Sequence, residues 1–334
     1  MNPLGSCFPE IDADRCVHAL APFASCRACV EICPTGAWLL DEEGLALATD
    51  RCTSCGQCVP ACPREALQMP RPMAILSRAK DQSDAFAACQ RSGVPGATLA
   101  CVHAIGLRDL DRMADDGINS LTIATGACAT CDRAPKGPDL EGAAARHARL
   151  RASRRQPVTT LRRLDADAYS RALARAKEDV DPVDRSRRRL FSAFVDRPPA
   201  VVATVPPEPA EPRAALRPQI DSARCVACDA CIRACPDGAM LSVATETGPA
   251  YVIEPLACTG CRLCIDVCDQ HAVSLDRDGL AASQQIGLDP YRCRACGVRY
   301  YALSGVAAPD AGGLCRICAR TGHFKKLYQV FKDA

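Results

Sequence analysis

Hydrophobic residues in this chain come in short runs, and several runs directly follow a cysteine-rich segment. Four of them share one form, in which a turn leads into a few apolar residues. They lie at residues 35–39, 64–69, 237–241 and 270–275. Apolar runs this short, bounded by turn residues, predict brief strands. Their recurrence after similar segments indicates an internal repeat.

Residues 73–133 have a different pattern, in which apolar runs alternate with a helical segment. The apolar runs predict strands at residues 85–89, 97–101 and 121–124. The spacing of apolar residues from Leu107 to Met113 predicts a helix that ends near Gly117. A strand, a helix and a strand in this order are typical of a βαβ unit with parallel strands. Cysteines then fall at the carboxyl ends of strands, where open α/β sheets bind ligands.

Residues 134–220 are rich in arginine, alanine and, later, proline. From Arg146 to Arg189 there are 13 arginines and one lysine against six acidic residues, a local charge of +8. The alanine content predicts helices, and the prolines of residues 198–218 predict an extended connector. We therefore expect a basic helical and proline-rich linker over residues 141–218. Nucleic-acid binding is not expected, because no aromatic residues alternate with the arginines.

The composition indicates a chain that needs metal to complete its folding. A length of 334 residues suggests two or three domains. Aromatic residues make up only 4% of the sequence, so the apolar supply is poor, and bound metal can supply the missing folding free energy. The first ten residues lack the features of a secretory signal, and no apolar stretch is long enough for a membrane span. We expect a cytoplasmic protein whose 25 cysteines stay reduced.

Sixteen of the cysteines form four similar runs. Three runs have the spacing C-x2-C-x2-C-x3-C, and their members are Cys52, Cys55, Cys58 and Cys62; Cys225, Cys228, Cys231 and Cys235; and Cys258, Cys261, Cys264 and Cys268. The other run is stretched, with Cys26, Cys29 and Cys33 preceded at a distance by Cys16. This is the ligand spacing of bacterial 4Fe–4S proteins, in which three cysteines of a run hold one cluster and the fourth holds its neighbour.

Residues 16–62 and 225–268 both resemble bacterial two-cluster ferredoxins. The resemblance implies four 4Fe–4S clusters with these ligands: Cys225, Cys228, Cys231 and Cys268; Cys258, Cys261, Cys264 and Cys235; Cys52, Cys55, Cys58 and Cys33; and Cys26, Cys29, Cys62 and Cys16. The chain departs from the family in the nine residues between Cys16 and Cys26, where the family has two. Cys7 is the alternative ligand, and a three-iron cluster is a further alternative.

Four more cysteines, Cys89, Cys101, Cys128 and Cys131, form a looser motif of two single residues and a close pair. The motif is similar to that of the delta subunit of methyl-viologen-reducing hydrogenases. This resemblance implies a 2Fe–2S cluster and electron delivery to a heterodisulfide reductase. Four thiolates also suit a 4Fe–4S cluster or zinc, and unligated cysteines at such positions would serve as small buried hydrophobic residues.

The last four cysteines are two C-x2-C pairs separated by 18 residues, Cys293 with Cys296 and Cys315 with Cys318. This spacing is typical of a structural zinc site and resembles that of zinc ribbons. A rubredoxin-like iron site is the alternative. The histidines at positions 18, 103, 147, 271 and 323 are expected to lie on the surface rather than to bind metal.

The predicted fold is α+β, with five parts. These are two ferredoxin-like units at residues 1–72 and 219–280, a small α/β domain with parallel strands at 73–140, the linker at 141–218 and a zinc ribbon at 288–334. The expected cofactors are four 4Fe–4S clusters, a further iron–sulfur cluster in the α/β domain and one zinc ion.

The cysteine sites predict electron transfer and no catalytic site. A 4Fe–4S cluster with four thiolates has no open position for substrate, and the sequence has neither a Walker loop nor a dinucleotide fingerprint. We therefore expect an electron-transfer subunit of a cytoplasmic oxidoreductase complex. Its partners would be a catalytic subunit with molybdopterin or flavin and an electron donor or acceptor protein. The alternative is an assembly or scaffold protein for a metalloenzyme, which docks through the zinc module and the linker.

Overall fold

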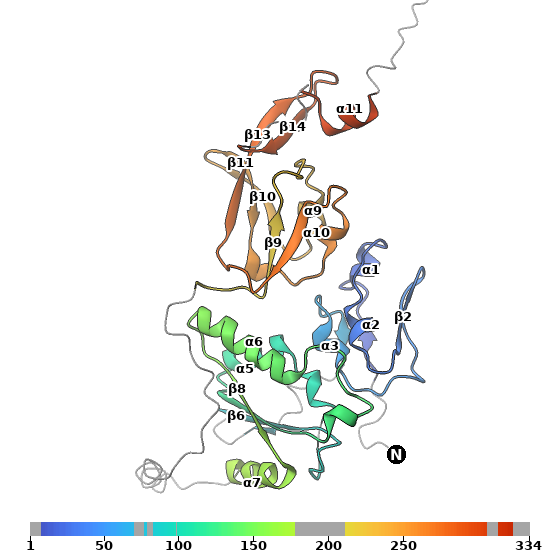
Figure 1. Cartoon of the computed structure of the whole chain (residues 1–334), viewed down its shortest axis with the longest axis vertical. Helices are drawn as coiled ribbons and strands as arrows, with labels where there is room; N and C mark the ends of the chain where they lie inside the picture. The colour runs from blue at the N-terminus through green and yellow to red at the C-terminus, as the bar shows by residue number, and fades with distance from the viewer. Residues whose placement is uncertain are drawn as a thin grey trace, which may run out of the picture. The chain divides into compact units, whose positions relative to one another are not determined.

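The chain divides into two compact units in the computed structural model (Figure 1). The first unit contains residues 1–22 and 26–212, and the second contains residues 23–25 and 213–334. The structure describes residues 8–69, 77–78, 83–97, 99–177, 211–305 and 313–322. Across these ranges, no helix combines the length and the apolar character needed to cross a membrane.

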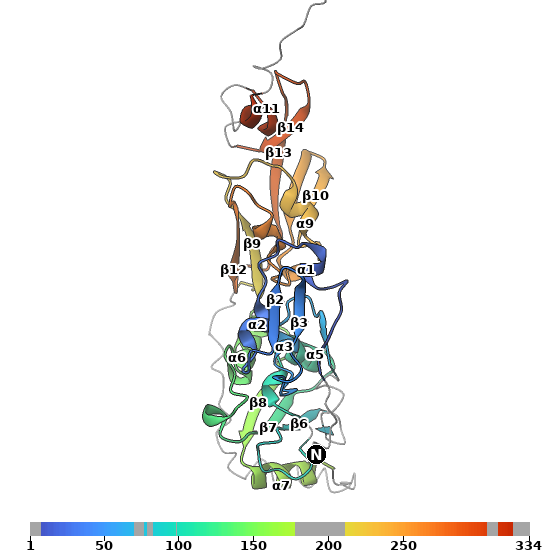
Figure 2. The same ribbon diagram turned by 90° about the vertical axis from the view of Figure 1, so that its right-hand side faces the viewer.

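Residues 8–69 form a lobe of short elements. Its helices are α1 (Val17–Leu20), α2 (Ala28–Ile32) and α3 (Cys58–Ala61), and its strands are β1 (Glu10–Ile11), β2 (Trp38–Asp41), β3 (Gly44–Leu47) and β4 (Leu67–Gln68). Strands β2 and β3 form an antiparallel hairpin (Figure 2), and β1 pairs with β4. The predicted short strands after the first two cysteine runs are confirmed as β2 and β4.

Thiols form a large part of this lobe's core. Cys29, Cys33 and Cys58 are buried together with Trp38 and Leu67. A lobe this small has few apolar side chains to bury, so the buried thiols supply a large share of its core.

A four-stranded sheet follows in the same unit, in the order β5-β6-β7-β8. Its strands are β5 (Ser77–Arg78), β6 (Asp84–Ala88), β7 (Ser120–Ala124) and β8 (Thr160–Leu164). Strands β6, β7 and β8 run parallel, and β5 is antiparallel to β6. The predicted βαβ unit is confirmed by β6, α5 (Leu107–Asp115) and β7. The strand predicted at residues 97–101 is reduced to a single bridge from Leu99 to Cys89.

Helices cover both faces of this sheet (Figure 1). Alternate residues of β6 show the division, since Ala85 and Ala87 pack with α5 and α6 (Leu140–Ser153), whereas Phe86 and Ala88 pack with α7 (Ala166–Lys177). Strands buried on both faces read as continuous apolar runs, as the sequence of β6 and β7 does.

The linker predicted at residues 141–218 is wrong for residues 141–177, which belong to the α/β part. Residues 140–177 complete the α/β part, because α6 crosses over to β8 and α7 then packs on the sheet. Leu140 and Leu150 of α6 are buried, and the ring of Tyr169 in α7 meets that of Phe86 edge to face at 5.9 Å. Of the proline-rich stretch predicted at 198–218, residues 198–210 lie outside the described residues, and its last residues enter strand β9 (Leu216–Ile220). The arginine run at 185–189 also lies outside the described residues.

The second unit carries the later cysteine runs. Its elements up to residue 277 are β9 (Leu216–Ile220), α9 (Ala230–Ala234), β10 (Met240–Thr245), β11 (Gly248–Ile253), α10 (Leu263–Asp266) and β12 (Val273–Arg277). Strands β9 and β12 pair antiparallel. The short strands predicted after the third and fourth runs are confirmed as β10 and β12.

One strand joins the second ferredoxin-like part to the last cysteines. The first half of β13 (Gln284–Arg292) pairs with β11, and the second half pairs with β14 (Arg299–Leu303). Together with β10 they form one antiparallel four-stranded sheet, and α11 (Arg316–Thr321) follows. The zinc-ribbon-like part expected from residue 288 therefore begins inside strand β13, which starts at Gln284.

Candidate iron–sulfur and metal sites

The three regularly spaced cysteine runs share one backbone path around their second cysteine. The residues directly before and after this cysteine have positive φ angles: Ser54 and Gly56, Ala227 and Asp229, and Gly260 and Arg262. Two residues with positive φ angles so close together make the chain turn sharply. A positive φ angle is unusual for a residue with a Cβ. The runs therefore wrap in the same way around a common kind of centre.

All four runs share a second feature at their last cysteine. The third residue after it has a positive φ angle in each run, at Gly36, Glu65, Gly238 and His271. The next residue is always a buried alanine: Ala37, Ala66, Ala239 and Ala272. In three runs the alanine N–H donates to the cysteine Sγ at 3.3 Å: Ala37 to Cys33, Ala66 to Cys62 and Ala272 to Cys268. Such bonds orient a ligating thiolate and favour its charged form.

The first lobe brings the thiol of Cys29 near those of Cys16, Cys26 and Cys62. Burial, together with the charges of Cys26, Cys62 and Cys16, raises the pKa of Cys29 to about 12. Thiols with so high a pKa lose their protons together only when a bound cation balances the charge. Cys16 directly precedes α1, so the extra residues before Cys26 include one turn of helix. Cys7 lies outside the described residues.

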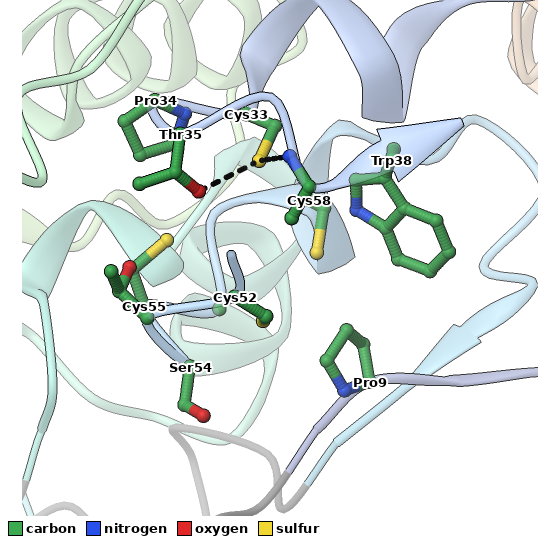
Figure 3. Close-up of a pocket in the computed structure, with 12 residues that line it drawn as sticks. Pro9, Cys33, Pro34, Thr35, Trp38, Cys52, Ser54, Cys55 and Cys58 are labelled. Carbon is green, nitrogen blue, oxygen red and sulfur yellow. Dashed lines mark hydrogen bonds between the residues drawn. The ribbon is translucent and has the colours of Figure 1, made fainter. Parts of the chain in front are cut away.

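A pocket in the same lobe is lined by Cys33, Cys52, Cys55 and Cys58, the second ligand set expected there. It holds about 320 Å³ of space, part of it open to solvent. Figure 3 shows the thiols of Cys33, Cys55 and Cys58 turned toward this space.

Hydrogen bonds and burial act in opposite directions on the thiols of this pocket. Burial tends to raise the pKa of Cys33, but bonds from the Ala37 N–H and the Thr35 hydroxyl outweigh it and lower the pKa. Burial raises the pKa of Cys58 to about 12, and the charge of Cys55 adds to this effect.

The second unit repeats both arrangements. Burial raises the pKa of Cys231 to about 12, and the charges of Cys225, Cys228 and Cys268 add to the rise. The other set lines a pocket of about 310 Å³, which contains Cys235, Cys258, Cys261 and Cys264. The two pockets correspond in sequence as well, because each takes the last cysteine of one run and the first three of the next.

The cysteines of the α/β part come from three loops on one side of its sheet. Cys89 follows β6, and Cys101 precedes a short 3-10 turn. Cys128 begins another 3-10 turn after β7, and Cys131 follows that turn. Cys89 and Cys101 are buried, and the other two are half-buried. Burial raises the pKa of Cys101 to about 12, and the charges of Cys55, Cys89 and Cys128 contribute. Cys55 belongs to the neighbouring lobe of residues 8–69.

The last four cysteines form a much tighter group. The Sγ atoms of Cys293, Cys296, Cys315 and Cys318 all lie within 4.8 Å of one another, and those of Cys296 and Cys315 are 3.8 Å apart. A Zn–S bond of about 2.3 Å in a tetrahedron gives a sulfur separation of about 3.8 Å. In the described ranges, no other group of three or more cysteine, histidine or carboxylate side chains meets this limit. The donor set fits a tetrahedral S4 metal.

Two side chains have roles that the sequence analysis missed. His147 was expected at the surface but is fully buried, with Nδ1 2.8 Å from an Asp111 carboxylate oxygen and Nε2 accepting from the Thr159 N–H at 3.1 Å. These two contacts join α6 to α5 and to the residue directly before β8. Gln57 lies inside the second cysteine run and is also buried, and its contacts reach the α/β part.

Comparisons with known proteins place iron–sulfur domains on the same segments. Residues 24–67 and 217–269 each match the model of a 4Fe–4S dicluster domain, and residues 8–38 match that of a 4Fe–4S binding domain. A ferredoxin of Rickettsia felis is 40% identical over 55 residues, which are 16% of this chain. The match spans half the length of that ferredoxin. The chain thus carries ferredoxin-type 4Fe–4S domains in both units, and these suggest an electron-transfer role.

Proposed function

We propose that this chain is an electron-transfer subunit of a cytoplasmic oxidoreductase complex, in which it relays single electrons between a catalytic subunit and a second redox protein. The observation that carries the proposal is the repetition of the ferredoxin-type ligand run four times, in two pairs on separate units. Each additional cluster lengthens the path that an electron can follow, and a lone electron carrier needs no more than one pair.

Each ferredoxin-type set offers four thiols, which supports a role in holding a cluster and not in binding substrate. Four cysteines per set leave no iron without a protein ligand, so a bound 4Fe–4S cluster would take up and release one electron. The Ala–Cys hydrogen bonds and the burial of the thiols would set its potential within the wide range open to such clusters. None of the 24 cysteines in the described residues forms a disulfide, which suits a reducing compartment.

Two further metal sites belong to the same proposal. Cys89, Cys101, Cys128 and Cys131 would hold a further iron–sulfur cluster, since no three of their sulfurs lie within the 4.8 Å of one another that the last four cysteines show. Cys293, Cys296, Cys315 and Cys318 would hold zinc, which would fix the loops after β13 and before α11. The catalytic partner would carry molybdopterin or flavin.

A second role, as an assembly or scaffold protein for a metalloenzyme, is favoured by the position of the four-thiol metal group. Val298 and Ile317 lie beside its ligands and are 52% and 59% exposed. Under this role, these exposed apolar side chains would contact the metalloenzyme. Under this role the partner would still bind when the iron–sulfur clusters are lost.

The test is anaerobic purification of the native complex, with cluster content and electron transfer measured together. We expect about four iron and four sulfide per ferredoxin-type set, and reduction of the co-purified partner through this chain. Partner binding without electron transfer would favour the scaffold role. Iron far below this level after anaerobic reconstitution would refute the electron-transfer proposal.

A further inference from the structure

Gln57 is the residue that distinguishes the second cysteine run from the other three. It directly precedes Cys58, and the residues at the same place in the other runs are Ala28, Ala230 and Leu263. Gln57 is only 2% exposed. A buried amide costs free energy unless it is hydrogen-bonded, so its presence in place of a small or apolar residue calls for a partner.

The partners of Gln57 lie in the α/β part, next to its cysteines. The Nε2 group donates to the carbonyl oxygen of Arg133 at 2.7 Å and to the Sγ of Cys101 at 3.6 Å. Within the described residues, its Oε1 atom is buried without a hydrogen-bond partner. Gln57 therefore connects the ligand loop of one set of thiols to a ligand of the next.

The backbone packs closely at the same contact. A Cβ on Gly56 would lie 3.1 Å from the Cβ of Ala104, and one on Gly106 would lie 2.4 Å from the Cβ of Pro60. Arg108 of α5 also donates to the carbonyl oxygen of Pro63 at 2.8 Å. The lobe and the α/β part thus pack closely, with no room for larger side chains at these glycines. The charge of Cys55 in the lobe contributes to the raised pKa of Cys101 in the α/β part.

We propose that the cluster held by Cys33, Cys52, Cys55 and Cys58 exchanges single electrons directly with an iron–sulfur cluster held by Cys89, Cys101, Cys128 and Cys131, and that Gln57 is the positioning residue between them. This inference rests on the proposed function. In each exchange one cluster loses an electron and is oxidised, and the other gains it and is reduced. No proton moves, and no covalent bond is formed or broken.

Gln57 has a defined effect on the second of these clusters. Its N–H group points at a ligand sulfur, and a hydrogen bond to that sulfur stabilises the more negatively charged reduced state. The bond therefore raises the reduction potential of the cluster at Cys101 and favours electron transfer toward it.

The first test uses the unmodified full-length protein, reduced anaerobically with dithionite and examined by EPR spectroscopy. Two reduced centres that lie near each other interact magnetically, so we expect the signal of the α/β centre to be split or broadened. Cys101→Ala should remove the signal of the α/β centre and leave the neighbouring cluster coupled only to the second cluster of its own lobe. An unsplit signal from the α/β centre, or zinc in place of iron at that centre, would overturn the inference.

The second test changes Gln57 alone. Gln57→Leu introduces the residue type found at the equivalent Leu263, and it should shift the electron-sharing equilibrium away from the α/β centre by about tenfold, or 59 mV for one electron. The matched control is Gln156→Leu, since Gln156 is exposed in the loop before β8, and it should leave the potential unchanged. If Gln57→Leu leaves the reduction potential of the α/β centre unchanged, Gln57 has no positioning role.

The iron and sulfide content separates this inference from the proposed function. If the four ferredoxin-type sets hold clusters but the α/β centre is magnetically isolated, only the inference fails. If those sets hold no clusters, the proposed function fails first. The magnetic measurement on the unmodified protein decides the inference even if Gln57→Leu does not fold.

Discussion

The backbone N–H of Ala272 donates a hydrogen bond to the Sγ of Cys268 at 3.3 Å. The corresponding bonds of Ala37 and Ala66 have the same length. The donor is a main-chain group, so the side chain at this position contributes only by being small enough to let the turn close. This explains why a buried alanine follows each run, whereas the residue before it varies from glycine to glutamate and histidine.

Ala272→Val should therefore destabilise the second unit. Ala272 is 3% exposed, so two added methyl groups must displace its neighbours, at a cost of roughly 1–3 kcal/mol in the free energy of unfolding. Anaerobic urea unfolding, followed by the loss of visible absorption, measures the effect. Ala244→Val is the matched control, because Ala244 is exposed on β10 and its replacement should cost less than about 0.5 kcal/mol. Equal losses in both variants would contradict the packing argument.

The cysteine loops and their strands were predictable from the sequence because their geometry is local. The spacing within a run determines the path of the chain around its cysteines. The apolar segment that follows is only a few residues long, so it forms only a short strand. Strands β6 and β7 were predictable for a related reason. They are buried on both faces, so their apolar runs are continuous and easily recognised.

The elements that were missed have patterns set by tertiary contacts. Strand β8 includes Arg162 and Arg163 at the edge of its sheet, and edge strands carry charge without losing their pairing. Strand β13 contains Pro290 and few apolar residues, and only its neighbours β11 and β14 define it. His147 is buried because Asp111 and Thr159, distant in sequence, satisfy both of its ring nitrogens.

Gly260→Ala should destabilise the second unit more than Gly238→Ala. Both glycines have a positive φ angle, which costs an alanine roughly 1–2 kcal/mol. A Cβ on Gly260 would also lie 2.4 Å from Leu216 Cδ1, whereas one on Gly238 meets nothing closer than 3.8 Å. In anaerobic urea unfolding, the free energy of unfolding of Gly260→Ala should be lower than that of Gly238→Ala by about 1 kcal/mol or more, because Leu216 must move. If Gly238→Ala proved the more harmful change, the tight contact at Gly260 would not matter.

Cys318→Ala should remove zinc and leave the iron–sulfur clusters in place. Cys318 is 1% exposed and its sulfur lies within 4.8 Å of the other three, so three thiols would remain for a metal that needs four ligands. Elemental analysis should show the loss of about one zinc per chain with unchanged iron. Amide hydrogen exchange should become faster in β14 and α11, because the metal joins their loops. Iron that falls together with zinc would contradict the assignment of separate sites.

Cys16→Ala should convert one 4Fe–4S cluster of the first lobe to a three-iron form, whereas Cys7→Ala should not. Cys16 is buried and its charge acts on Cys29, as expected of a thiol in the same ligand set. A 4Fe–4S cluster held only by Cys26, Cys29 and Cys62 lacks a thiolate for its fourth iron, so iron should fall by about one per chain. EPR spectra of the oxidised protein should then show a three-iron signal. The same signal from Cys7→Ala, with Cys16→Ala unchanged, would assign the ligand to Cys7 and leave the helical turn α1 with no part in the site.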